Sequence, residues 1–155
     1  MRWEYYDDPG APTPNSLVVA TSAVVLDSQG RVLMQRRADS GNWALPGGAM
    51  ELDESLVASV VREVKEESGY EIEVTGLVGT YTDPLHIIAY SDGEVRRQFN
   101  VCYTARVTGG KLAISDESIE IRFVDQAELD RLPMHQTQRL RLRHFFEKRR
   151  EPYLG

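Results

Sequence analysis

Three glutamates crowd one turn of a predicted helix. Glu63, Glu66 and Glu67 are spaced i, i+3 and i+4, so a helix brings their carboxylates together near its C-terminal end. Negative charge is unfavourable there, because the helix macrodipole is also negative at that end. Carboxylate oxygens are ligands that Mg²⁺ prefers, and this ion commonly bridges carboxylates to substrate phosphates. The cluster therefore predicts either a solvated acidic face or a site for a hard divalent cation.

A glycine-rich turn precedes the predicted helix. Leu45-Pro46 ends a strand, and Gly47-Gly48 follows as a flexible turn. Because glycine permits close approach of the backbone, the Gly47 carbonyl is expected to reach the same metal. The helix is predicted over residues 54–67, with Ser55 as a capping residue type at its start and Gly69 as its stop. Its apolar stripe, which we expect to pack on a sheet and so aim the carboxylates at a cleft, consists of Leu56, Val57, Val60, Val61 and Val64.

The fixed residues of this stretch follow a recognisable spacing. From Gly48, Glu54 follows after five residues and Arg62-Glu63 after a further seven, and the stretch closes with Val64, Glu66-Glu67, Gly69 and Tyr70. From Gly48 to Tyr70 the chain resembles the Nudix hydrolase family, with every fixed charged and glycine position matched. It departs at Asp53, where many members carry Gly, and at Tyr70, where an aliphatic residue is usual. Neither residue is a proposed ligand, so the match favours the metal site over the solvated face.

The resemblance implies a reaction and a set of ligands. Nudix enzymes hydrolyse a diphosphate linked to another moiety, usually in a nucleoside diphosphate derivative. The expected cofactor is Mg²⁺, for which Mn²⁺ can substitute. The implied ligands are Glu63, Glu66, Glu67 and the Gly47 carbonyl, and Arg62 is expected to orient Glu63 and to offset the charge of Glu66 through an i,i+4 contact.

A carboxylate base is also expected, and its identity stays open. Nudix enzymes often place one more catalytic glutamate in a loop or at a strand start after the signature. Glu117 and Glu120, in the acidic segment 115–120, both fit that description loosely. The other sources are Glu63 and Glu67 in the helix itself, in which case the segment is only solvated surface.

Three residues are candidates for substrate contact. Arg37 ends a predicted strand shortly before the glycine turn, where its guanidinium is expected to face phosphate. Trp43 either stacks on a base or packs in the core or at its rim. Tyr81 precedes the segment 82–84, and Pro84 resembles a proline that ADP-ribose hydrolases of this family often carry at this distance from the signature. This segment either stiffens a loop beside the cleft or is an ordinary turn.

The remaining elements are predicted from hydrophobic alternation and turn residues. They are strands at 17–26, 31–37, 71–81 (broken by Gly76 and Gly79), 86–90, 95–107 and 121–124, a short helix at 126–132 and a final helix at 136–150, with hairpins closed by 27–30, 91–94 and Gly109-Gly110. Short hairpin links indicate a mixed, largely antiparallel sheet covered by helices, an α+β fold. The resemblance sharpens this to the Nudix α/β/α sandwich.

The expected organisation is a single domain over 1–155, with an aromatic and proline-rich N-terminal arm at 1–16. The arm either packs on the domain, roofs the substrate pocket or contacts a second subunit, which leaves a homodimer open. His86 is read as a lone histidine with no companion at ligand spacing, without a catalytic role. The basic residues of the final helix are expected to form a solvated face, with RNA or phosphate contact as the alternative.

Composition limits the possible partners and compartments. The chain has 155 residues, 41% hydrophobic and 27% charged, with a net charge of −6, so stable nucleic-acid binding is not expected. Cys102 is the only cysteine, which excludes an internal disulfide and fits the cytoplasm. No apolar run is long enough to span a membrane, and the first residues do not form a signal peptide.

Three functions remain open from the sequence. The favoured one is hydrolysis of a nucleoside diphosphate derivative such as ADP-ribose or a related nucleotide sugar. The second keeps the enzyme class but takes a nucleoside triphosphate or an RNA 5′ end. The third is a non-catalytic, nucleotide-binding regulatory module, against which the complete set of carboxylates argues.

Overall fold

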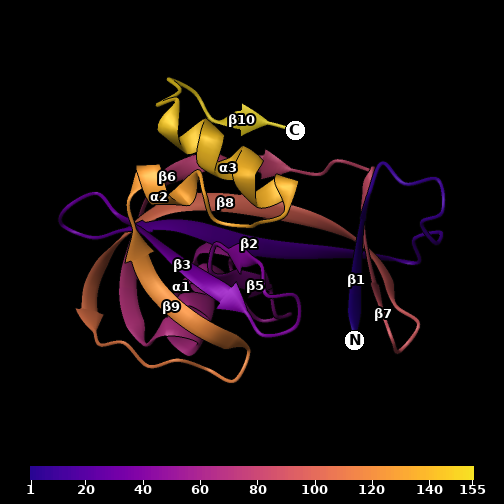
Figure 1. Cartoon of the computed structure of the whole chain (residues 1–155), viewed down its shortest axis with the longest axis horizontal. Helices are drawn as coiled ribbons and strands as arrows, with labels where there is room; N and C mark the ends of the chain where they lie inside the picture. Colours follow the sequence, from indigo (N-terminus) through magenta and orange to yellow (C-terminus); the bar gives the residue numbers. More distant parts are fainter.

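The computed structural model describes residues 1–155 and contains one mixed sheet with three helices (Figure 1). The strands are β1 (Arg2–Tyr6), β2 (Ser16–Leu26), β3 (Val32–Arg37), β4 (Trp43–Ala44), β5 (Gly47–Ala49), β6 (Tyr70–Tyr81), β7 (His86–Tyr90), β8 (Val95–Gly110), β9 (Ser118–Val124) and β10 (Tyr153–Leu154). The helices are α1 (Leu56–Ser68), α2 (Gln126–Leu129) and α3 (Gln136–Phe146). No helix is both long enough and apolar enough to cross a bilayer.

The sheet is largely antiparallel, as predicted. Its main path runs β1-β7-β8-β2-β3-β4, while β5 joins β2, β6 joins β8, β9 joins β3 and β10 joins β6. Only the β2–β8 and β10–β6 pairs are parallel. The long parallel pair of β2 with β8 lies at the centre of the fold, so β2 is buried along most of its length.

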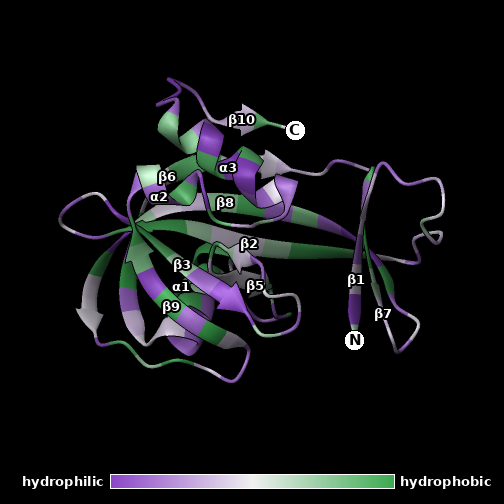
Figure 2. Ribbon diagram, viewed as in Figure 1, coloured by the Kyte–Doolittle hydropathy of each residue, from purple (hydrophilic) through white to green (hydrophobic).

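Both faces of the central sheet are covered by helices. Successive side chains of a strand point to opposite faces. In β2, Ala23 and Val25 pack in one core cluster with Val60 of α1, while Val24 packs in a second cluster with Leu142 of α3. Figure 2 shows β3 changing from hydrophobic to hydrophilic colouring toward its end, where Gln35, Arg36 and Arg37 follow the apolar residues. The helix–sheet–helix layering confirms the predicted fold class.

Helix α1 ends where its sequence signals predict. Ser55 is the N-cap and its side chain accepts a hydrogen bond from the Ala58 backbone N–H. Gly69 is the C-cap in the left-handed region, with φ of 81°. A Cβ at Gly69 would lie 2.2 Å from the carbonyl oxygen of Lys111, so only glycine fits. The helix covers Leu56–Ser68, close to the predicted 54–67.

One predicted hairpin is short and another is absent, because other strands pair with the same segments. β2 and β3 pair antiparallel as predicted, but only at Leu26 and Val32, since β5 and β4 pair with the remaining lengths of these two edges. Gly109-Gly110 closes no hairpin, because β8 continues through it and pairs with the start of β6. The predicted breaks of β6 are confirmed as shifts of register beside Gly76 and Gly79.

The C-terminal part also differs from the prediction. β9 begins at Ser118, so Glu120 lies within a strand, and β10 follows as a further strand. Helix α3 stops at Phe146, well before residue 150. Lys148, just beyond the helix, has a positive φ of 49°, which is incompatible with helix continuation.

The N-terminal arm packs on the domain. Its strand β1 pairs antiparallel with β7 over its whole length, from Arg2 opposite Tyr90 to Tyr6 opposite His86. In Figure 1 this pair lies at the opposite end of the molecule from β9. Arg2 and Glu4 of the arm also line a cleft, so the arm forms part of its wall.

Candidate active site

The structure brings four glutamates to one pocket. Glu63, Glu66 and Glu67 of α1 line it together with Ser115 and Glu117 from the segment before β9. Glu66 is largely exposed, Glu63 is mostly covered and Glu67 is only 4% exposed. The three helix carboxylates therefore lie at different depths in one pocket, which we call the glutamate pocket.

Glu67 is a buried carboxylate with neutral hydrogen-bond partners. Its Oε2 accepts hydrogen bonds from Gln35 Nε2 at 2.8 Å and from the Gly47 backbone N–H at 3.2 Å. The pKa of Glu67 is raised to about 9, mainly because the carboxyl group is buried and also because the charge of Glu63 lies close by. No arginine or lysine compensates this carboxylate directly, so its ionised form needs a cation from outside the chain.

Gln35 is a site residue that sequence reasoning missed. It is 5% exposed, and its amide oxygen accepts a hydrogen bond from Ser118 Oγ at 2.7 Å. Ser118 thereby fixes the amide so that its NH₂ group points at Glu67. The available signal was a polar residue directly after the buried run Val32–Met34 of β3.

Arg62 links the glutamates to the turn before α1. Its Nη1 donates to Glu63 Oε1 at 3.0 Å and to Glu66 Oε2 at 3.1 Å, the latter being the expected i,i+4 contact. Its Nε donates to Glu54 Oε2 at 2.5 Å, and its Nη2 donates to the Ala49 carbonyl at 3.2 Å. The hydrogen bond with Glu54 is the main cause that raises the pKa of Arg62. Glu54 thus buttresses the turn through Arg62.

The two glycines of the turn contact the site in different ways. A Cβ at Gly48 would lie 2.6 Å from Glu63 Cδ, so the Glu63 carboxylate packs directly on the Gly48 backbone. A Cβ at Gly47 would lie 2.1 Å from the backbone oxygen of Thr21 on β2. Gly48 therefore makes room for a site carboxylate, whereas Gly47 makes room for the neighbouring strand.

The residues present fit a hard divalent cation. Three carboxylates from one helix supply oxygen donors, and burial raises the pKa of both Glu63 and Glu67 in the metal-free protein. Ser115 Oγ, which lines the same pocket, is buried without a hydrogen-bond partner. A cation here would stabilise the ionised carboxylates that the fold places together.

The two candidate bases lie in different surroundings. Glu117 lines the glutamate pocket, and its charge contributes to the raised pKa of Glu67. Glu120 lies opposite Arg36 in the β3–β9 pair, and its carboxylate accepts a hydrogen bond from Arg122 Nε at 2.8 Å. Glu117 thus shares a pocket with the helix glutamates, while Glu120 is engaged by an arginine on its own strand.

Of the three predicted substrate contacts, two line one cleft and the third lies elsewhere. Arg37 and Trp43 line a second, mainly polar cleft, in which Arg37 makes a bidentate ion pair with Asp39 at 2.9 and 2.7 Å. Trp43 is 5% exposed and packs in the core, as the alternative reading expected, with Arg122 stacked 5.0 Å from its ring. Tyr81 lies under α3, away from the glutamates.

Tyr81 is held in the core by other aromatic groups. Its hydroxyl is 2.8 Å from His144 Nδ1, its ring lies 5.2 Å from that of Tyr153, and it is 9% exposed. Tyr81 lines a hollow together with the predicted loop residues Asp83 and Pro84. The structure therefore assigns the tyrosine a packing role and leaves the loop accessible.

The second cleft, which we call the polar cleft, begins at the glycine turn. Its walls include Gly47, Gly48 and Gln35 next to the glutamates, Asn100 on β8, and His135 and Gln138 at the start of α3. Gln138 Oε1 accepts a hydrogen bond from the Leu45 backbone N–H at 3.1 Å. The polar cleft thus adjoins the glutamate pocket, because Gly47 and Gln35 line the cleft and donate hydrogen bonds to Glu67 in the pocket.

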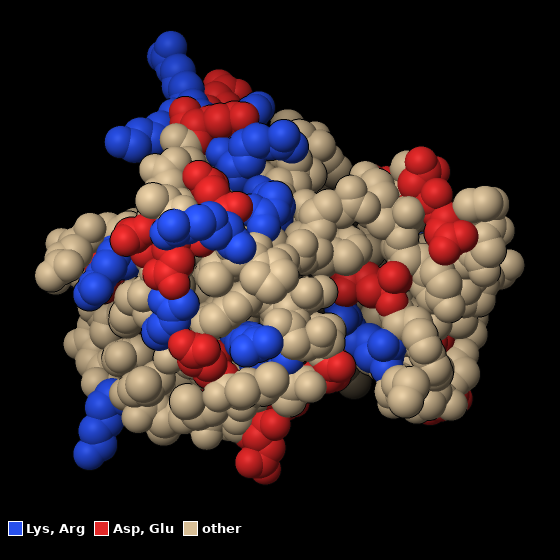
Figure 3. Space-filling model, in the orientation of Figure 1, with Lys and Arg blue, Asp and Glu red and all other residues tan.

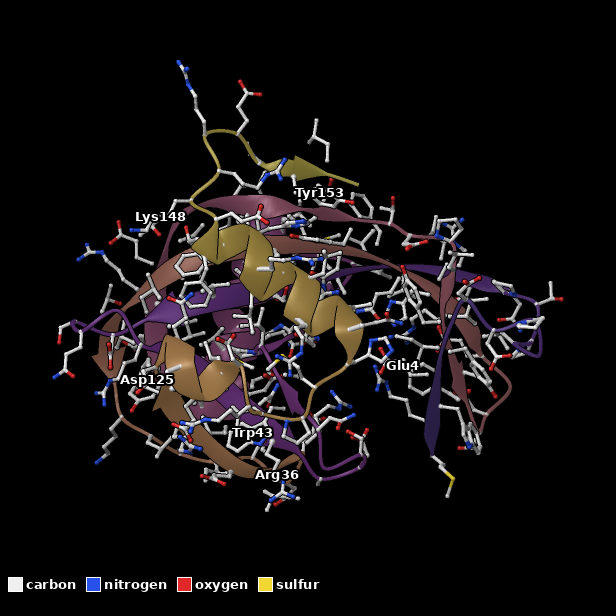
Figure 4. All side chains as sticks on the ribbon, turned by 45° about the horizontal axis from the view of Figure 1, so that its top comes forward. Glu4, Arg36, Trp43, Asp125, Lys148 and Tyr153 are labelled. Carbon is white, nitrogen blue, oxygen red and sulfur yellow. The ribbon has the colours of Figure 1, made fainter.

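His86 is not a lone histidine, contrary to the expectation from sequence. Its Nε2 lies 2.6 Å from Glu4 Oε1, and His135 Nδ1 lies 3.6 Å from the same oxygen. Figure 4 shows Glu4 beside the start of α3, where these three groups meet. Arg2 Nη1 already donates to Glu4 Oε2 at 3.1 Å, so this cluster is less suited to a cation than the glutamate pocket.

The comparison with known families decides the assignment. The NUDIX domain family matches residues 16–145. The chain belongs to the Nudix family. A crystal structure of a NUDIX hydrolase from Nitrosomonas europaea superposes with a TM-score of 0.74, at 23% identity, over 97% of this chain and 85% of that one.

Two curated relatives extend the Nudix comparison. A "MutT-like protein" of Streptomyces ambofaciens is 48% identical over 71 residues, which are 46% of this chain and 46% of the relative. An "ADP-ribose pyrophosphatase" of Methanocaldococcus jannaschii is 31% identical over 112 residues, which are 70% of this chain and 62% of the relative. The chain thus matches about half to three fifths of the length of these relatives.

Proposed function

We propose that this Nudix protein is a Mg²⁺-dependent hydrolase that cleaves the diphosphate linkage of a nucleoside diphosphate derivative. The observation that carries the proposal is the glutamate pocket itself. It holds a carboxylate, Glu67, that is 4% exposed and has only neutral hydrogen-bond partners, beside Glu63 and Glu66. Such an arrangement is unfavourable in the metal-free protein and is explained by a divalent ion shared with substrate phosphates.

The chain's own residues have distinct roles in this proposal. Glu63, Glu66 and Glu67, with the Gly47 carbonyl, hold the ion, for which Mn²⁺ can substitute for Mg²⁺. Arg62 orients Glu63, to which it donates at 3.0 Å. When bound, the ion neutralises phosphate charge and lowers the pKa of a coordinated water, so attack at neutral pH needs no histidine base.

We assign the general base to Glu117. It lines the glutamate pocket, within which a carboxylate can take a proton from an attacking water. Glu63 and Glu67 are the alternatives, because both carboxyl groups have a raised pKa in the metal-free protein. Glu120 is the weaker candidate, because Arg122 occupies its carboxylate.

The proposed substrate class is ADP-ribose or a related nucleotide sugar. The name of the M. jannaschii relative, an ADP-ribose pyrophosphatase, supports it, as does the accessible loop with Asp83 and Pro84 that lines a hollow beside α3. Arg37 is proposed to contact the substrate from the polar cleft, next to the glycine turn, and Trp43, predicted from sequence as a possible contact, to support this cleft through packing. Tyr81 is proposed to act through packing beneath this loop.

On the face shown in Figure 3 acidic side chains interrupt the basic ones, which supports a small nucleotide over a nucleic acid as the substrate.

A hydrolysis panel tests the proposal. The kcat/KM values for ADP-ribose, diadenosine polyphosphates, 8-oxo-dGTP and 5′-triphosphate RNA are compared at one Mg²⁺ concentration, with both products identified. We expect ADP-ribose to be preferred and to give AMP and ribose 5-phosphate. A strong preference for any triphosphate with release of pyrophosphate would overturn the substrate class, and no turnover of any substrate would support a binding module. The cytoplasmic location and the homodimer stay predictions.

A further inference from the structure

Arg141 is a buried cation on helix α3. The sequence predicts the basic residues of this helix as a solvated face, but Arg141 is only 5% exposed. Its guanidinium lies 5.4 Å from the centre of the Tyr81 ring, which is itself in the core. The arginine is therefore held inside the fold, and its charge is removed from water.

No carboxylate of the chain compensates this charge. The Arg141 guanidinium makes no hydrogen bond and no ion pair, and its Nε is buried without an acceptor. The nearby carboxylate, Glu4, is already bonded to Arg2 and His86. A buried charge without a partner is costly, so the fold retains Arg141 for a reason other than stability.

The other arginines of the polar cleft differ from Arg141 because they form ion pairs. Each of them has a carboxylate partner: Arg2 with Glu4 at 3.1 Å, Arg37 with Asp39 at 2.7 Å and Arg96 with Glu94 at 3.0 Å. Arg141 alone among them keeps its donors free. An anion that enters the cleft therefore meets one buried guanidinium that needs no rearrangement of an existing ion pair.

The polar cleft has the size and lining for a small anionic group. Arg141 lines it together with amide side chains such as Gln98, Asn100 and Gln138. Its volume of about 140 Å³ is well below that of pockets enclosing a whole drug-sized ligand. The cleft also borders Gly47 and Gly48, so a group held there stays next to the glutamate pocket.

We propose that Arg141 is the anion-binding residue of the polar cleft, and that its ligand is a phosphate group of the nucleotide. A guanidinium presents a planar set of donors that matches a phosphate, and low solvent exposure strengthens the pair. The identity of the ligand rests on the proposed function, whereas the anion site rests on the burial and free donors of Arg141. Arg141 is then a binding residue that ties substrate affinity to α3, outside the signature stretch 48–70.

The direct test follows the Arg141 Nε–H resonance in the wild-type protein. Inorganic phosphate and AMP are titrated separately in EDTA, so that no metal and no hydrolysis take part. We expect the Nε–H signal to shift saturably with both probes. Tighter binding of AMP than of inorganic phosphate would identify a nucleotide phosphate as the source, and equal affinity would identify the phosphate group alone. An unchanged Nε–H signal at saturation of either probe would overturn the proposal.

Variants separate a binding role from a packing role. We expect Arg141→Leu to weaken AMP binding at least tenfold while its unfolding temperature stays equal or rises, because an uncompensated charge is removed. Arg141→Lys should fall between wild type and Arg141→Leu. Arg150→Leu, which removes the same charge from an exposed position outside the polar cleft and the hollow beside α3, should change binding less than twofold.

The outcomes distinguish this site from the proposed reaction. Wild-type affinity for AMP in Arg141→Leu would overturn the anion site, even if hydrolysis is observed. Loss of AMP binding in Arg141→Leu together with no hydrolysis of any substrate by the wild type would support the anion site and refute the proposed function. If Arg141→Leu does not fold, the wild-type Nε–H titration and the affinity of Arg141→Lys decide.

Discussion

Replacing Gly48 by alanine is predicted to damage the metal site without unfolding the protein. A Cβ at this position would lie 2.6 Å from Cδ and Oε1 and 2.7 Å from Oε2 of Glu63, distances at which the carboxylate must move away. The Glu63 carboxylate is the end of a flexible side chain, so it can turn toward solvent. It would then lose its hydrogen bond from Arg62 at 3.0 Å and its place in the glutamate pocket.

The expected losses of stability and of activity in Gly48→Ala follow from the displacement of the Glu63 carboxylate. A hydrogen bond between charged groups contributes about 1.5–3 kcal/mol, and relief of the repulsion between Glu63 and Glu67 offsets part of that loss. Stability is thus expected to fall by roughly 1 kcal/mol. Removing a residue that only hydrogen-bonds to a metal ligand typically lowers metal affinity or activity ~10–100-fold. Displacing the ligand Glu63 itself should lower them at least as much.

The assay compares three glycine variants by Mg²⁺-dependent kcat/KM and by thermal unfolding in EDTA. Gly109→Ala is the matched control, because its Cβ would lie 2.8 Å from the Glu71 carboxylate, an exposed side chain outside the site. Gly47→Ala should instead destabilise the fold, since its Cβ meets the backbone of Thr21 at 2.1 Å. Wild-type turnover in Gly48→Ala would refute the placement of Glu63 as a metal ligand.

Three more expectations concern the same pocket. Glu117→Gln should lower kcat by about 10²-fold or more, as for a general base, while Glu120→Gln should keep wild-type kcat; equal values for both would leave the base in the helix. In EDTA the free energy of unfolding should fall as pH rises from 4.5 to about 9, because folded Glu67 holds a proton that the unfolded chain releases. Glu67→Gln should flatten that denaturation profile, and a flat wild-type profile would show that Glu67 ionises normally. Calorimetric titration of Mg²⁺ should give a lower Kd with a non-hydrolysable ADP-ribose analogue, and equal Kd values would argue against a phosphate-bridged ion.

The signature helix could be predicted because its determinants are local. The capping Ser55, the stop at Gly69 and the 3.6-residue spacing all act within one segment. The clustering of Glu63, Glu66 and Glu67 follows directly from that helix. Most strands were also predictable, because buried alternation and turn residues mark them in the sequence.

The rest depends on contacts between distant segments. Gln35 meets Glu67 across 32 positions, and Glu4 meets His86 across 82, so spacing along the chain carries no sign of either pair. The burial of Arg141 likewise depends on where α3 packs against the sheet. The predicted β2–β3 hairpin is confirmed only next to its turn for the same reason, since β5 pairs with the same edge of β2 further along.

The measurement that tests the central claim most directly is turnover by Glu66→Gln and Glu67→Gln with the preferred diphosphate substrate and Mg²⁺. Thermal unfolding in EDTA is measured on the same samples. Both variants should lose turnover while their unfolding temperatures stay equal or rise. Glu66→Gln removes a negative charge from a crowded pocket, and Glu67→Gln removes the need to protonate a buried carboxyl group on folding. Near-wild-type turnover in both folded variants would contradict the assignment of these glutamates to a catalytic metal.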